Sequence, residues 1–119
     1  MLRRQSEMET QVLVNCHEGT GNVHCRTVLR AADSELGIRF MHDDVIEPGA
    51  SIGEHLHRDE EEVYFVVEGH GTMILDGQRF GIGPGDVSLV GRGHSHGLEN
   101  SPDGPMRLVV YCVKPPAGG

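Results

Sequence analysis

The chain lacks several features that define common classes of protein. Its 119 residues contain no Trp, three Phe and two Tyr, and no apolar run approaches the roughly 20 residues of a membrane-spanning helix. The polar N-terminal residues are not followed by the apolar stretch of a secretory signal. Lys and Arg number 10 against 18 Asp and Glu, and the formal charge of −8 disfavours nucleic acid binding. We therefore expect a cytoplasmic protein that binds neither nucleic acid nor a membrane.

Helical periodicity is also scarce. Residues 31–36 form the one candidate, and they are too few for more than a turn. The chain instead has 17 Gly and frequent turn sequences between short apolar runs, a pattern typical of β proteins. Asp76-Gly77, between TMIL and QRFGI, predicts a type I′ hairpin. Ten strands are expected in a closed or double-layered all-β fold, at 12–16, 23–29, 38–46, 53–58, 61–68, 71–75, 78–82, 86–90, 95–99 and 106–113.

This length predicts a single domain. We place it at 11–114, between a flexible N-terminal arm at 1–10 and a C-terminal tail at 115–119. The three cysteines show no C-x-x-C spacing and are expected to be small core or surface residues. The chain has eight histidines, more than packing requires, and this content suggests a metal-binding site.

His55 and His57 are two residues apart, so on a strand both side chains point to the same face. An acidic run follows, and its last member, Glu62, begins the next apolar strand in phase with Tyr64. We assign the carboxylate role to Glu62 and interpret Glu60 and Glu61 as a solvated turn.

His96 comes from a later strand. Three imidazoles and one carboxylate suit Mn, Fe, Co, Ni, Cu or Zn, whereas Ca and Mg prefer oxygen ligands. The predicted site is therefore one divalent transition metal ion on His55, His57, Glu62 and His96. Four protein ligands would leave two positions free on a six-coordinate ion, as a catalytic site requires.

These residues resemble the two motifs of the cupin superfamily. The first, G-x5-H-x-H-x(3,4)-E-x6-G, reads GASIGEHLHRDEEEVYFVVEG from Gly49 to Gly69, with every fixed position filled. The second, G-x5-P-x-G-x2-H-x3-N, reads GDVSLVGRGHSHGLEN from Gly85 to Asn100, with Gly91 in place of Pro. The resemblance implies a single-domain jelly-roll β-barrel (a double-stranded β-helix), the same four metal ligands and a homodimer.

A cupin fold does not fix the reaction. The leading hypothesis is a metal-dependent oxygenase or decarboxylase acting on a small organic acid, a polyketide-like molecule or a phenol, with Fe or Mn favoured. Glu62 would act as ligand and base, and Tyr64 would hydrogen-bond a ligand or the substrate, or else only pack. The alternatives are an isomerase, cyclase or lyase that needs no O₂, and a non-catalytic metal- or small-molecule-binding module.

Several residues keep open roles. His94 is either a proton shuttle at the rim of the site or an exposed turn residue. Either His42 or Arg39 could meet an anionic substrate, unless both charges face outward. His17, His24 and His70 receive no role. The strands at 12–16 and 23–29 could pair with a partner's sheet, which would protect an open edge.

Overall fold

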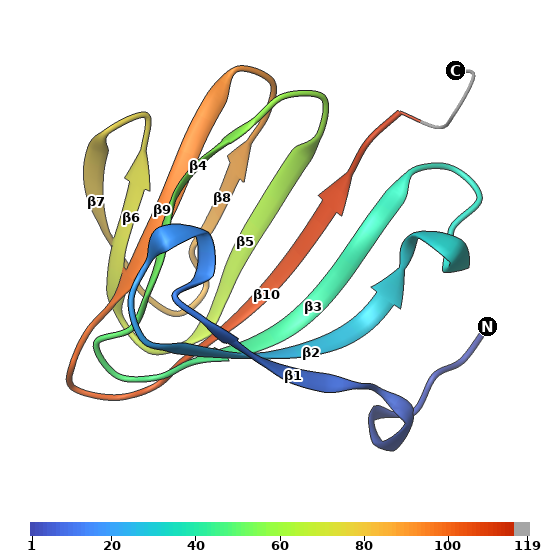
Figure 1. The fold of residues 1–119 in the computed structure, drawn as a ribbon, viewed down its shortest axis with the longest axis horizontal. Coiled ribbons are helices and arrows are strands. Elements are labelled where there is room, and N and C mark those ends of the chain that lie inside the picture. The colour runs from blue at the N-terminus through green and yellow to red at the C-terminus, as the bar shows by residue number, and fades with distance from the viewer. Residues whose placement is uncertain (116–119) are drawn as a thin grey trace.

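The computed structural model describes residues 1–115, and two antiparallel sheets dominate it (Figure 1). The ten strands are β1 (Thr10–Val14), β2 (Asn22–Arg30), β3 (Ile38–Ile46), β4 (Ser51–His57), β5 (Glu61–Glu68), β6 (Gly71–Leu75), β7 (Gln78–Ile82), β8 (Val87–Val90), β9 (His94–Asn100) and β10 (Met106–Val113). There are also three short 3-10 turns: η1 (Gln5–Glu7) precedes β1, and η2 (Cys16–Glu18) and η3 (Ala31–Asp33) connect β1 to β2 and β2 to β3. In the part of the chain described, no helix has the length and apolar character to cross a bilayer.

The strand order is that of a jelly roll. One sheet has the order β1-β2-β3-β10-β5-β8 and the other β4-β9-β6-β7. The last strand, β10, lies between β3 and β5, and β9 lies between β4 and β6, so each sheet contains neighbouring strands that are distant in sequence. The all-β prediction is confirmed, and each predicted strand overlaps an observed one.

The core lies between the two sheets, as the alternation of the strands requires. On β10 the side chains of Met106, Leu108 and Val110 are buried, and the residues between them are less so. They pack against Ile52 and Leu98 of the smaller sheet. Side chains that project from these strands into the interior therefore meet those of the opposite sheet.

Positive backbone φ angles explain the fixed glycines of both motifs. Gly49, Gly69, Gly85 and Gly93 have φ between 74° and 94°, a region where only glycine is unstrained. At Gly69 a Cβ would also lie 2.7 Å from the carbonyl oxygen of Pro105. The Asp76-Gly77 hairpin is confirmed, because both residues have the positive φ of a type I′ turn and Leu75 pairs with Gln78.

The N-terminal segment contacts the barrel. Arg3 donates to the carbonyl oxygen of Val28 and to the carboxylate of Asp33, and β1 begins at Thr10, the last residue of the expected arm. The domain boundaries stay a prediction, and residues 116–119 of the expected tail lie outside the described residues.

Candidate metal centre

A β-bulge aims the first two histidines into the barrel. Ile52 pairs with Leu98 and His55 with His96, so three steps along β4 match two along β9. The extra residue shifts the phase of β4, and His55 and His57 come to share the inward face with Ile52. Gly53 lies in this bulge, where a Cβ would lie 2.0 Å from the carbonyl oxygen of His17.

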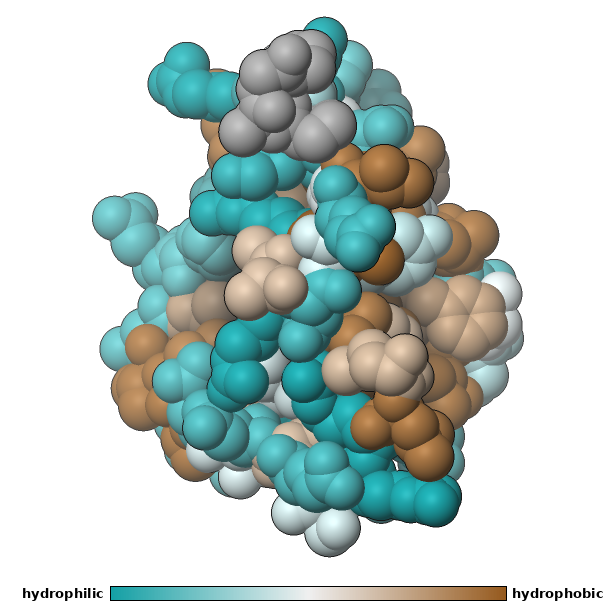
Figure 2. All heavy atoms as spheres, turned by 90° about the vertical axis from the view of Figure 1, so that its right-hand side faces the viewer, coloured by the Kyte–Doolittle hydropathy of each residue, from teal (hydrophilic) through white to brown (hydrophobic). Residues whose placement is uncertain are grey.

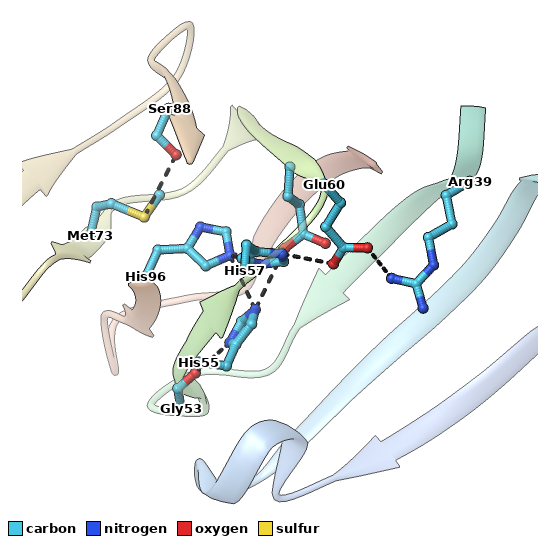
Figure 3. A network of polar contacts seen from close by, with 9 residues as sticks. Arg39, Gly53, His55, His57, Glu60, Met73, Ser88 and His96 are labelled. Atoms are coloured by element: carbon cyan, nitrogen blue, oxygen red, sulfur yellow. Dashed lines mark hydrogen bonds and ion pairs between the residues drawn. The ribbon is translucent and has the colours of Figure 1, made fainter. Parts of the chain in front are cut away.

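Four side chains converge in the interior, three from β9 and β4 and one from β5 of the opposite sheet. His96 Nε2 lies 3.0 Å from His57 Nε2, 3.1 Å from His55 Nε2 and 2.9 Å from Glu62 Oε1. Glu62 Oε1 lies 3.4 Å from His57 Nε2 and 3.6 Å from His55 Nε2. Figure 3 shows the three rings pointing toward one another. The structure thus brings together the four residues predicted from the motifs, and they can hold one metal ion.

Hydrogen bonds on the far side of two rings fix which nitrogen faces the centre. His55 Nδ1 lies 2.8 Å from the carbonyl oxygen of Gly53, and His57 Nδ1 lies 2.8 Å from Glu60 Oε1. Both partners only accept, so each Nδ1 carries the hydrogen and each Nε2 presents a lone pair. Lone pairs at such short separations repel unless a cation lies among them. The donor set therefore fits a divalent metal ion.

The neighbouring imidazoles favour an ionised carboxylate despite its burial. Burial raises the pKa of Glu62, but the contacts of its carboxylate with the imidazoles of His55 and His96 outweigh it and hold this pKa well below its usual range. The side chains of His57, Glu62 and His96 are at most 7% exposed, and that of His55 is 13% exposed. Solvent therefore approaches the centre from the side of His55.

Glu60 supports the site from behind, so its prediction as a solvated residue is wrong. The side chain is half-buried, and it joins His57 to Arg39 of β3 by an ion pair (Figure 3). A carboxylate behind a metal-binding imidazole orients the ring and raises its basicity. Glu61 is exposed, as predicted, although it is the first residue of β5 and not part of the turn. The spacing of three residues from His57 to Glu60 was the available signal.

Two aromatic contacts flank the histidines. The ring of Tyr64, a buried residue, stacks on His96 with centroids 4.3 Å apart. Burial and the charge of Glu62 raise the pKa of Tyr64 well above its usual value. The ring of His17 stacks on His55 at 3.7 Å. Sequence reasoning missed His17, because its position depends on left-handed backbone at Asn15 and at His17 itself.

The structure shows which of the residues with open roles face the interior and which lie at the surface. His94 is exposed, as one of the two predicted roles requires, but it is the first residue of β9 and not part of the turn, and its Nδ1 lies 2.7 Å from Asp76. His42 faces the interior in register with Val110. Arg39 lies on the other face of β3 and contacts Glu60. His24 contacts Glu47 at the surface.

A family model described as a cupin domain matches residues 43–113. The chain belongs to the cupin family. This cupin is 31% identical to the oxalate-binding protein of Thermotoga maritima over 113 residues, which span 95% of this chain and 93% of that protein. It is 32% identical to quercetin 2,3-dioxygenase of Escherichia coli over 79 residues, 64% of this chain but only 34% of that enzyme.

A solved structure agrees over nearly the whole cupin. The crystal structure of "a predicted oxalate decarboxylase" from Thermotoga maritima superposes with a TM-score of 0.90 at 27% identity, covering 96% of this chain and 99% of that one. The jelly-roll barrel expected from the two motifs is thereby confirmed.

Proposed function

We propose that this cupin is a metal-dependent enzyme acting on a small organic acid, by oxygenase or decarboxylase chemistry. One observation carries the proposal: four buried donor atoms face one point, and hydrogen bonds leave the lone pairs of His55 and His57 unused. Such a set suits a borderline metal such as Fe or Mn. When bound, the metal would supply a Lewis acid that holds substrate oxygens.

Each residue has a distinct task in this proposal. The three histidines and Glu62 would hold the metal, and Glu60 keeps His57 oriented. Glu62 is ionised, so its carboxylate can accept a proton from a substrate beside it. Tyr64 stays protonated and can donate a hydrogen bond from its hydroxyl. His55 is the most exposed of the four residues, and the ring of His17 covers one of its faces, so substrate would enter past His17.

The relatives favour an acid as the substrate. The relative that aligns over nearly the whole chain is named an oxalate-binding protein, and the superposed structure is described as a predicted oxalate decarboxylase. Oxalate presents two oxygens at once, which matches the two positions that four protein ligands leave on a six-coordinate ion. The quercetin dioxygenase adds phenols as a second substrate class to test.

The test compares metal-free protein with protein reconstituted with Fe²⁺ or Mn²⁺. O₂ uptake and CO₂ release are measured with oxalate, a diketone and a catechol. Turnover is expected with at least one of them, and it should disappear in His96→Ala but persist in the surface variant His94→Ala. Turnover that persists without O₂ and releases no CO₂ would support an isomerase, cyclase or lyase instead. Absence of turnover together with a ligand-induced rise in Tm would indicate a binding module.

A further inference from the structure

A second cluster of donor atoms lies on the inner face of the larger sheet. It consists of Cys25 on β2 and of His42 and Asp44 on β3, and one donor atom of each lies within 4.8 Å of those of the other two. Cys25 and Asp44 are direct partners in the register of β2 and β3, and His42 is two residues before Asp44 on the same face. None of the three belongs to the centre described above.

The backbone places this cluster as it places the histidines of the first centre. There, His55 and His57 are two apart on one strand, and His96 stands opposite His55 on the next. Here, His42 and Asp44 are two apart, and Cys25 stands opposite Asp44. In both cases a same-face pair and a cross-strand partner put three side chains within reach of one ion.

One buried polar atom of the cluster lacks a hydrogen-bond partner in the described part of the chain. Asp44 is only 5% exposed, and its Oδ1 has no hydrogen-bond partner among the described residues. Cys25 is fully buried and forms no disulfide. A buried carboxylate oxygen without a partner destabilises the fold, because it has lost its hydration and gained nothing. A cation among the three side chains would remove this penalty.

We infer that Cys25, His42 and Asp44 bind a second divalent transition metal ion, of the kind that accepts a thiolate ligand. A sulfur, a nitrogen and an oxygen donor are typical ligands of Zn²⁺ and Co²⁺, and three protein ligands leave one tetrahedral position open. The half-buried His42 is the member of the cluster that solvent reaches, so the ion enters past its ring.

In the metal-free protein, protons take the place of this ion. Burial raises the pKa of Asp44 to about 7 against a hydrogen bond from Cys25 that lowers it, and the charges of Asp43 and Glu62 add smaller upward contributions. Burial and the nearby Asp44 raise the pKa of Cys25 to about 12. Metal binding must displace both protons, so the affinity of the cluster rises with pH.

Cobalt distinguishes the two sites, since only the second contains sulfur. Titration of metal-free protein with Co²⁺ at pH 8 should show a second equivalent bound per chain, with the thiolate-to-cobalt absorption band of the near ultraviolet. Cys25→Ser should abolish that band and one equivalent. Cys112→Ser changes a buried cysteine on the same sheet face and should retain the band.

Two further variants keep the test valid if Cys25→Ser does not fold. His42→Gln changes a half-buried side chain, and it should weaken the band even if Cys25→Ser does not fold. His96→Ala should remove the first equivalent and retain the band. One equivalent of Co²⁺ in the folded wild-type protein, absence of the band, or a band that survives Cys25→Ser would each overturn the second site.

Discussion

His57 on β4 donates its Nδ1 hydrogen to Glu60 Oε1 across 2.8 Å, and Glu60 is held in turn by Arg39 of the opposite sheet. This relationship extends the metal centre beyond the four residues that the motifs name. The orientation of one metal-binding ring depends on a carboxylate in the β4–β5 turn, and the carboxylate depends on a cation from β3.

The first prediction concerns a variant that lacks the Glu60 carboxylate. Glu60→Ala should lower the metal affinity of the centre by about 10–100-fold, because His57 loses the acceptor that fixes its tautomer. Competition against a chelator of known affinity measures the change. The control is Glu61→Ala, since Glu61 is adjacent and exposed. Equal affinities in the two variants would show that Glu60 does not support the ring.

The second prediction concerns a variant that lacks the proposed metal ligand His96. His96→Ala should lower metal occupancy by more than Glu60→Ala does, because His96 Nε2 contacts all three other donors. Circular dichroism should show that the barrel still folds. Elemental analysis of the purified variant gives the occupancy, with the exposed His94→Ala as its control. Full metal retention in His96→Ala would exclude His96 from the site.

The sequence predicted the fold and the four converging residues because both depend on local rules. Glycine-rich turns delimit the strands, and strand periodicity puts Glu62 and Tyr64 on one face. The motif spacing predicts that His55 and His57, two residues apart on one strand, point to the same face. The bulge at Gly53, which turns both histidines inward, leaves no trace in that spacing.

Long-range pairing explains what the sequence could not show. The contact of Glu60 with Arg39 requires the β4–β5 turn to lie against β3. The Cys25–Asp44 pair depends on the register of β2 against β3, and a slip of one residue would turn one of them outward. The position of His17 depends on unfavourable backbone angles that a pattern of residue types does not predict.

The third prediction concerns the last fixed residue of the second motif. Asn100 Nδ2 donates to the carbonyl oxygens of Ile46, Glu47 and Gly104, at 2.9–3.0 Å. Asn100→Ala removes a donor from each of these carbonyls, although Glu47 O still accepts from the N–H of Ala50, and it should lower the free energy of unfolding by about 2–3 kcal/mol. Urea denaturation measures it. Asn22→Ala, which loses one 3.4 Å contact, should cost less than about 1 kcal/mol, and equal losses would contradict the assigned role of Asn100.

The fourth prediction is a pH dependence of stability. Burial raises the pKa of Asp44 from 3.8 to about 7, so the folded protein keeps a proton that the unfolded chain releases. The stability of metal-free protein should therefore fall as the pH rises through this interval, by about 4 kcal/mol at most.

The isosteric Asp44→Asn variant isolates this effect. It carries no ionisable group, so in metal-free protein it should be more stable than wild type at pH 8 and show no advantage at pH 4. Asp43→Asn, which loses an ion pair with Arg107, should give no such gain at pH 8. Denaturant titrations at both pH values compare the three proteins, and a gain for Asp44→Asn that is the same at both would contradict the burial of the charge.

The last prediction is the homodimer. Within residues 1–115, the strand β1 forms one edge of the larger sheet and pairs only with β2. It exposes Val12 and Val14 by 51% and 66%. An open strand edge with apolar side chains favours pairing with a second copy. Hydrophobic side chains also gather in several separate groups on the face in Figure 2.

Light scattering after size exclusion should therefore give twice the chain mass of 13.0 kDa. Val12→Lys should shift the protein toward the monomer, because a charge on this edge opposes pairing. The matched control is Val87→Lys on β8, the opposite edge of the same sheet, where Val87 is 65% exposed. Dissociation by Val87→Lys alone would move the interface to β8, and a 13.0 kDa wild-type species would exclude the dimer.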